Sequence, residues 1–199
     1  MEIPEAEVRR IACSLHLLSL CGGPDKREGL DKCVRAWGAK CTVYDIEISP
    51  ELDIVDEGRW QLVRTDLMNN VYDSTGSAAP CSTFSGGRRN DGGPRPLRGE
   101  KPPDIFGFKW LWPEEKEKVR IGTCLAHRCL DASDIMVTQC KPFWFETPKR
   151  RPGTPSLFKL PRALALADKE GVDIEAMVQC ELEALSTKPT DFMSYLVDL

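Results

Sequence analysis

Several features are scarce or absent in this sequence. It has no run of about 18 apolar residues and no basic segment leading into an apolar stretch, so neither a membrane span nor a secretion signal is expected. Only two histidines occur, and no two cysteines are separated by two residues, which argues against a structural zinc site. These absences favour an intracellular protein, nuclear or cytoplasmic, with no metal site and no membrane contact.

The cysteines are nine in number and irregularly spaced. A secreted disulfide framework uses an even number of cysteines, so reduced thiols are expected here. The chain has 199 residues, 41% of them apolar, which is enough to bury one sizeable core but not two. One domain over residues 1–199 is therefore predicted, and the sequence leaves its oligomeric state open.

Basic residues are concentrated in two windows, although the chain as a whole has a charge of −4. Residues 84–101 contain five basic and two acidic residues, and residues 141–162 contain six basic and one acidic residue. The remainder is strongly acidic. This segregation favours one basic face that attracts phosphates, although two solvated loops would give the same composition.

The first half of the chain has the pattern of a βαβ unit. An apolar run at 11–20 stops at glycines, apolar positions at helical spacing follow at 25–37, and residues 40–48 are rich in β-branched residues. Further helices are expected at 59–68, 114–137, 162–167 and 174–180, and further strands at 71–77 and 143–146. Gly122 weakens the long helix by about 1 kcal/mol relative to alanine. The predicted fold class is α/β, with a Rossmann-like, doubly wound, mostly parallel sheet and helices on both faces.

A long loop rich in glycine and proline follows Cys81, over residues 86–103. Loops of this length in compact domains are functional lids or disordered segments. Because the loop is also basic, it is a candidate lid over a nucleic-acid base. Trp110 and Trp112 either pack under this lid or contact a base.

Ligands of open α/β sheets bind beyond the carboxyl ends of the strands. Small residues after the first strand let backbone amides approach a ligand, and an acid after the second strand accepts hydrogen bonds from ribose hydroxyls. Similar turns and acids occur in many domains without a ligand. The candidate residues for an adenosine-containing cofactor are Cys21, Gly22, Gly23, Pro24, Asp45, Ile46, Glu47, Asp53, Ile54 and Pro80.

Two short segments are more specific: APCSTFS at residues 79–85 and FETP at residues 145–148. They resemble the nucleophile and acid motifs of the cytosine-5 DNA methyltransferases. The similarity extends in the family's order from residue 15 to about 160, with residues 20–24 similar to the first cofactor loop, 45–47 to the ribose-binding acid and 53–54 to the adenine contacts. Residues 80–85, 93–98 and 156–161 also look like divergent phage and retroelement branches of that family.

This resemblance implies a class I S-adenosylmethionine-binding domain that methylates carbon 5 of cytosine in DNA. Cys81 would be the nucleophile, since a thiolate must add to carbon 6 of the ring, and Glu146 would hold ring nitrogen 3. Arg88 would be a catalytic arginine or a phosphate contact. Because cysteine is often simply buried, an inert Cys81 is the structural alternative. The candidate DNA contacts are Ser85, Arg89, Arg95, Arg98, Lys149, Arg150 and Arg151.

The sequence departs from the family at several positions. Cys21 stands where a phenylalanine is usual, Thr147 replaces the asparagine of the acid motif, and Ala79 replaces a proline. The late Gln-x-Arg-x-Arg motif is absent, and the chain is too short for the family's large target-recognition domain. Either target recognition lies in other domains of a longer parent protein, or the chain is a minimal or decayed enzyme. An inactive nucleic-acid-binding module and a methyltransferase for RNA or protein remain alternatives.

Other candidate residues have a structural interpretation. His16 and His127 lack a second ligand at metal spacing, so a structural role is expected for both. Cys124 and Cys129 share the long helix with apolar neighbours and are expected to pack in the core.

Overall fold

A computed structural model describes residues 4–23, 30–88, 94–178 and 189–196 of the 199-residue chain. These residues form one six-stranded sheet with the order β2-β1-β3-β4-β6-β5. The strands are β1 His16–Leu20, β2 Lys40–Tyr44, β3 Ser74–Ser77, β4 Phe143–Pro148, β5 Val172–Val178 and β6 Pro189–Tyr195. Strands β2, β1, β3 and β4 are parallel neighbours, whereas β6 is antiparallel to β4 and to β5. The protein is therefore of the α/β class, with a mixed and mostly parallel sheet.

Strand β1 lies in the interior of the sheet, and four of its five residues are buried. Such a continuous buried run is typical of a parallel strand covered on both faces. The chain goes from β1 to β2 on one side and then returns to β3 on the other side. The strand order thus reverses at β1, and that reversal point is where α/β sheets bind ligands.

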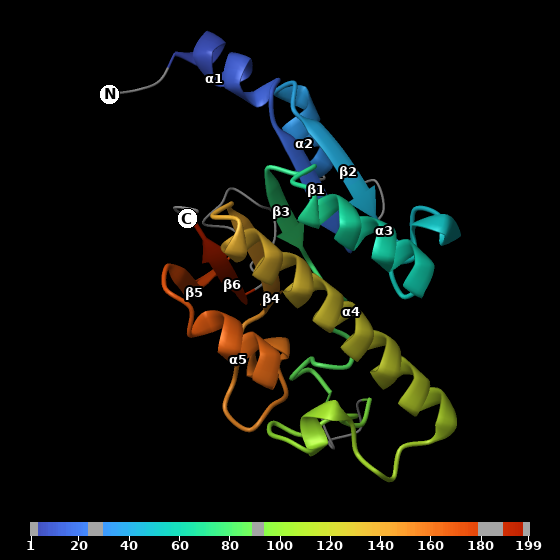
Figure 1. Ribbon diagram of the computed structural model, residues 1–199. Helices are drawn as coiled ribbons and strands as arrows, with labels where there is room; N and C mark the ends of the chain where they lie inside the picture. Colours follow the sequence, from blue (N-terminus) through green and yellow to red (C-terminus); the bar gives the residue numbers. More distant parts are fainter. Residues whose placement is uncertain (1–3, 24–29, 89–93, 179–188, 197–199) are drawn as a thin grey trace.

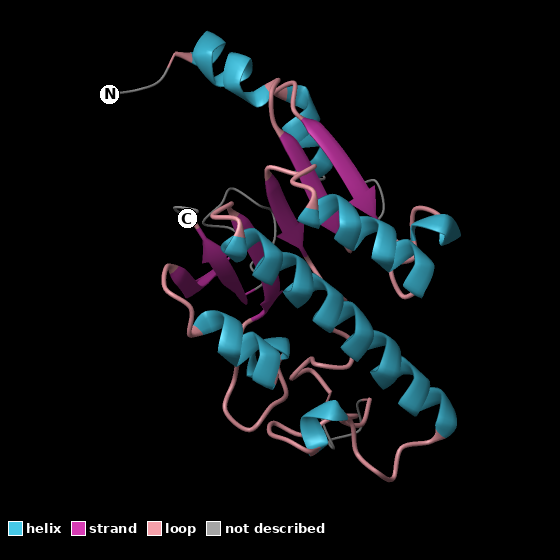
Figure 2. Ribbon diagram, viewed as in Figure 1, coloured by secondary structure: helices cyan, strands magenta, loops and turns pink. Residues whose placement is uncertain are grey.

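The described helices differ in length and in the part of the sheet that they cover. They are α1 Glu5–Ala12, α2 Leu30–Ala36, α3 Glu57–Met68, α4 Pro113–Thr138 and α5 Pro161–Ala167, with short 3-10 turns at Pro50–Leu52, Asp104–Phe106 and Leu157–Lys159. The long helix α4 packs against β3, β4, α3 and α5 (Figure 1). Figure 2 shows α3, α4 and α5 on the near side of the strands, with α2 behind β1 and β2. None of the described helices is both long and apolar enough to span a membrane.

The core lies between the sheet and helices α3 and α4. Leu18 and Leu20 of β1 and Phe143 and Phe145 of β4 are fully buried. They belong to one cluster with the inward-facing apolar residues of the two helices, which include Val63, Leu67, Ala126, Leu130 and Met136. Burial of this apolar area is the main favourable term for folding.

The structure confirms several expected elements and corrects others. The helices expected at 59–68, 114–137 and 162–167 and the strand expected at 143–146 are present with shifted ends. The apolar run at 11–20 is not one strand, because Ile11 lies in the last turn of helix α1, where it is 43% exposed, and the strand begins only at His16. The expected helix at 174–180 is also wrong, since residues 172–178 are strand β5; residues 179 and 180 lie outside the described part.

Candidate functional site

A cavity of about 240 Å³ lies at the carboxyl ends of β1, β2 and β3. We call it the strand-end cavity. It brings together eight of the residues that the sequence suggests for a cofactor: Cys21, Gly23, Asp45, Ile46, Glu47, Asp53, Ile54 and Pro80. Gly22 is not part of the lining. A Cβ at this position would lie 2.8 Å from the Ser19 hydroxyl oxygen. Pro24 lies outside the described residues.

Asp45 follows β2 directly and is nearly buried, with 8% of its surface exposed. Its Oδ2 accepts a hydrogen bond from the Gly23 amide at 2.7 Å, and its Oδ1 accepts one from the Glu47 amide at 2.8 Å. The carboxylate therefore joins the loop after β1 to the loop after β2. Each oxygen keeps one further lone pair. Binding of ribose hydroxyls by Asp45 stays a prediction. Glu47 lines the same cavity and offers a second, more exposed carboxylate.

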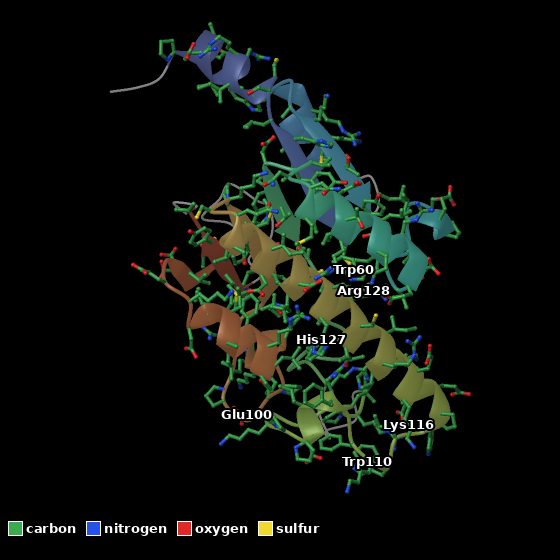
Figure 3. The ribbon with its side chains drawn as sticks, in the orientation of Figure 1. Trp60, Glu100, Trp110, Lys116, His127 and Arg128 are labelled. Atoms are coloured by element: carbon green, nitrogen blue, oxygen red, sulfur yellow. The ribbon has the colours of Figure 1, made fainter. Side chains whose placement is uncertain are left out.

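The loop that contains Asp53 and Ile54 is fixed by Arg128 of helix α4. The guanidinium donates to the carbonyl of Ile54 and, at 2.9 Å, to the carbonyl of Asp56. It also lies 5.7 Å from the ring of Trp60 on α3, and Figure 3 shows the two side chains between the helices. A buried arginine with several acceptors orders backbone that would otherwise be a free loop. Adenine contact by Asp53 and Ile54 stays a prediction.

Cys21 forms part of the wall between the strand-end cavity and α4. Its backbone is left-handed, with φ of +57°, and its amide donates to the Tyr44 carbonyl at 2.9 Å. A hydrogen bond with Cys129 and burial raise the pKa of the Cys21 thiol well above its usual range. Because only a thiolate is nucleophilic, Cys21 is a packing residue of the cavity rather than a reactive one.

A second cavity, of about 350 Å³, contains Cys81 and is here called the Cys81 cavity. One wall is the loop after Cys81, with Ser85, Gly86 and Gly87. The opposite wall consists of Pro148, which ends β4, Lys149 and Arg151 of the loop that follows, and Pro189, which begins β6. Cys81 is partly buried, and its carbonyl accepts the Phe84 amide at 2.9 Å in a tight turn. Pro80 lines the strand-end cavity and Cys81 lines the second one, so this pair of residues stands between the two cavities.

Glu146 reaches the same edge of the sheet through β4. Strand β4 is parallel to β3, with Phe145 level with Ser77, so Glu146 lies level with the chain that leaves β3 toward Cys81. Burial alternates along β4, and Glu146 shares its less buried face with Pro148, which lines the Cys81 cavity. Glu146 is not itself among the residues that line this cavity, so a catalytic contact between Glu146 and Cys81 stays a prediction.

Arg98 corrects the sequence analysis. Its side chain is only 1% exposed, and burial lowers its pKa to about 10. The guanidinium carbon lies 3.8 Å from the centroid of the Phe84 ring. Its nitrogens donate to the hydroxyls of Thr83 and Thr123 and to the carbonyls of Ile105 and Val119. The expectation that Arg98 contacts DNA is therefore wrong, because this residue is an internal anchor of the loop.

Arg88 is also an internal link of the loop. Its Nε donates to the Ser82 carbonyl at 2.7 Å, and its Nη1 donates to the Arg95 carbonyl at 3.3 Å. One guanidinium therefore joins the backbone of Ser82, next to Cys81, to the backbone of Arg95. The catalytic role of Arg88 stays a prediction, since its cation remains close to the turn that contains Cys81.

The remaining basic candidates divide into paired and open residues. Arg95 forms an ion pair with Glu115, and Arg150 forms one with the buried Asp191. Lys149 and Arg151 are exposed at the Cys81 cavity, where Ser85 also lies. Arg89 lies outside the described residues. The structure thus leaves Lys149 and Arg151 as the cations best placed for a phosphate at this cavity.

Lys159 ties the loop after Cys81 to the loop after β4. Its ammonium donates to Glu100 at 2.7 Å and to the carbonyl of Arg151 at 2.9 Å. Glu100 is labelled in Figure 3 near the lower end of the molecule. The two loops that enclose the Cys81 cavity are thus cross-linked to each other.

Sequence reasoning missed the apolar part of the strand-end cavity. Its lining also includes Tyr44, Leu52, Ala78 and Leu125. Tyr44 and Ala78 adjoin strand ends and could have been found from that position. Leu125 lies within α4, more than 40 residues after Cys81, and no local pattern distinguishes it from the other apolar residues of that helix.

The histidines have structural partners. The Nε2 of His16 lies 2.8 Å from the Thr42 hydroxyl, and the ring of His127 faces Phe106 at 6.5 Å. Burial lowers the pKa of His127, which is labelled on α4 in Figure 3. Among the described residues, no group of three or more histidine, cysteine or acidic side chains is placed to hold a metal ion.

Comparison of the chain with protein-family models and with curated proteins found no match. The functional interpretation therefore depends on the residues and on the geometry of the two cavities.

Proposed function

We propose that the chain is a class I S-adenosylmethionine-dependent methyltransferase that acts on carbon 5 of cytosine in DNA. In this proposal the sheet is a Rossmann-like, doubly wound sheet whose ligand site is the point where the strand order reverses after β1. The observation that carries the proposal is the position of Pro80 and Cys81 between the strand-end cavity and the Cys81 cavity. A transferase needs a donor on one side of its reacting group and an acceptor on the other, and these two cavities offer both places.

The chemistry of the strand-end cavity fits an adenosine-containing methyl donor. Leu52, Ile54 and Leu125 give it an apolar side that suits a purine ring, while Asp45 and Glu47 supply carboxylates for ribose hydroxyls. When bound there, S-adenosylmethionine supplies the methyl group as an electrophile. The chain itself contributes two contacts: the Gly23 amide donates to Asp45, and Arg128 donates to the Ile54 carbonyl. These hydrogen bonds hold the two sides of the cavity in place before the donor binds.

The Cys81 cavity supports the other half of the reaction. The Cys81 thiolate adds to carbon 6 of cytosine, and the displaced electron pair makes carbon 5 nucleophilic. The Glu146 carboxyl group holds ring nitrogen 3 and stabilises the charge that develops on addition. Carbon 5 would then form a bond to the methyl group of the donor, whose sulfur–methyl bond breaks so that it leaves as a neutral thioether. Loss of the carbon 5 proton to solvent would expel the thiolate and restore the ring. Lys149 and Arg151 bind the phosphates on either side of the target nucleotide.

The target base has to lie in a single strand or leave a duplex to reach such a pocket. The Cys81 cavity is bordered by Gly86 and Gly87, whose small size leaves room for a base edge close to the backbone. DNA is therefore the proposed partner, bound at this edge of the sheet.

Methyl transfer to DNA by matched cysteine variants tests the proposal. Wild type and Cys33→Ala, which changes an exposed cysteine on α2, are expected to methylate cytosine at the same rate. Cys81→Ala is expected to reduce methyl transfer to background while still binding S-adenosylmethionine in calorimetry. Equal activity of Cys81→Ala and wild type would contradict the mechanism. Binding of DNA without binding of the methyl donor would instead indicate a nucleic-acid module with no activity.

A further inference from the structure

An exposed stack of aromatic rings lies between the loop after Cys81 and the start of α4. Phe108 and Trp110 are stacked, with centroids 5.0 Å apart and planes inclined by 13°. The guanidinium carbon of Arg95 lies 4.8 Å from the Trp110 centroid and 4.4 Å from the Trp112 centroid. We call these four residues the aromatic platform. Figure 3 shows Trp110 at the lower end of the molecule, near Lys116 at the start of α4.

The platform is held in place although it is exposed. Glu115 accepts a hydrogen bond from Arg95 Nε at 2.8 Å and another from the Trp112 amide at 3.0 Å, so one carboxylate fixes both members. The Phe108 amide donates to the Leu97 carbonyl at 3.1 Å. Trp110 and Trp112 nevertheless remain 53% and 64% exposed. Exposed aromatic rings with a fixed arrangement are typical of binding surfaces rather than of a core.

The charge around the platform selects the kind of ligand. Arg95 already lies against both tryptophan rings, so a cationic group such as a methylated lysine has no free place there. Glu115, which joins Arg95 to Trp112, is neutralised by Arg95. Lys109 and Lys116 lie in the same segment as the exposed Glu114, and none of these three forms an ion pair within the described ranges. Flat rings beside unpaired cations suit a ligand with planar bases and an anionic backbone.

Arg88 connects the platform to the Cys81 cavity. Its guanidinium bonds to the carbonyl of Ser82, next to Cys81, and to the carbonyl of Arg95 in the platform. A strand with its target base in the cavity would therefore pass close to the platform. We propose that the platform stacks the unpaired bases of a single-stranded nucleic acid whose target base enters the Cys81 cavity. This inference rests on the proposed function, because that function defines the cavity as the place of the base.

Binding of a fluorescein-labelled single-stranded 20-nucleotide DNA, followed by anisotropy without the methyl donor, tests the inference. Stacking of one base on an aromatic ring is worth roughly 1–3 kcal/mol, so Trp112→Ala is expected to weaken binding about 5- to 150-fold. Trp112→Phe keeps a ring and is expected to retain most of the affinity, which separates loss of stacking from misfolding. Trp37→Ala is the matched control, because Trp37 is also exposed and has Arg9 5.1 Å from its ring.

Two results would overturn the inference. One is wild-type affinity in Trp112→Ala; the other is an equal loss in Trp112→Ala and Trp37→Ala. The assay needs neither the methyl donor nor Cys81, so it fails independently of the proposed function. If the wild-type protein transfers no methyl group but its affinity for single-stranded DNA depends on Trp112, the enzyme is rejected and the platform is supported. Methyl transfer by a protein whose DNA affinity is unchanged by Trp112→Ala would support the enzyme and reject the platform.

Discussion

Asp45 determines the shape of the strand-end cavity through two hydrogen bonds, one to each of its carboxylate oxygens. Asp45→Asn keeps the size of the side chain but replaces one acceptor oxygen with an amide donor. Since a hydrogen bond to a charged group is worth about 1.5–3 kcal/mol, we expect S-adenosylmethionine to bind about 10-fold more weakly or worse. Calorimetry of the variant measures this. Unchanged affinity would mean that the link between the two loops does not organise the cavity.

Cys21 predicts a specific pH dependence of stability. The Cys129 hydrogen bond and burial raise its pKa in the folded state above that in the unfolded state. The folded state therefore holds the proton more tightly, and the stability gained is present below the unfolded pKa of about 8.5 and is lost as pH rises. Cys21→Ser, which does not titrate there, is expected to lose less stability between pH 7 and 10. Urea unfolding at both pH values measures the difference, and parallel losses in the two proteins would contradict it.

At the scale of elements, the sequence predicts those helices and strands whose buried residues recur at the spacing of a helix or a strand. The sequence predicts α3, α4 and β4, and burial in the structure follows the period of each type of element: Trp60, Val63 and Leu67 are buried at helical spacing in α3, and burial alternates along β4. Residues 174–178 of strand β5 predict a helix from sequence, because Glu175, Ala176 and Met177 are good helix formers. The segment is a strand because it pairs with β6, which lies more than ten residues further along the chain. Pairing with a strand that is distant in the sequence overrides the local propensity of a segment. A single sequence does not show which strands pair.

Gly122 shows why a residue that weakens a helix can be required by packing. A Cβ at this position would lie 2.8 Å from Thr83 Oγ1 and 3.3 Å from Arg98 Nη2. Gly122→Ala gains about 1 kcal/mol of helix propensity but pushes α4 away from the buried arginine. Overpacking typically costs about 1–3 kcal/mol, so a net loss of stability is expected, with a weaker hold on the loop after Cys81.

Gly58→Ala in α3 is the matched control for this prediction, since only a flexible Asp56 side-chain oxygen lies within 3.3 Å of the new Cβ. Chemical denaturation of both variants compares them. A Gly122→Ala protein at least as stable as Gly58→Ala would show that α4 does not need this close approach.

At the scale of the whole molecule, position at a strand end predicts which residues come together better than charge does. Eight candidates for the cofactor line one cavity, because the carboxyl ends of parallel strands meet at one edge. Charge was less reliable. Arg98 is internal, and Arg150 pairs with Asp191, 41 residues away in sequence. Composition counts a charge in the same way whether it is buried, paired or free, so these roles depend on the folded structure.

The arrangement of the molecule puts three surfaces next to one another. The strand-end cavity, the Cys81 cavity and the aromatic platform are linked in series by the Pro80–Cys81 pair and by Arg88. In our account these are the places of the methyl donor, the target base and the neighbouring unpaired bases. Substitutions at one surface are therefore expected to affect one ligand more than the other two.

The account depends most on covalent addition of Cys81 to the target ring. DNA that contains 5-fluorocytosine lacks the proton whose loss would release the enzyme, so the adduct is expected to persist. Incubation with S-adenosylmethionine, followed by digestion and mass spectrometry, identifies the cysteine that is attached. We predict one adduct, on the peptide that contains Cys81. Attachment to a different cysteine, or no adduct with DNA and methyl donor both bound, would contradict the account.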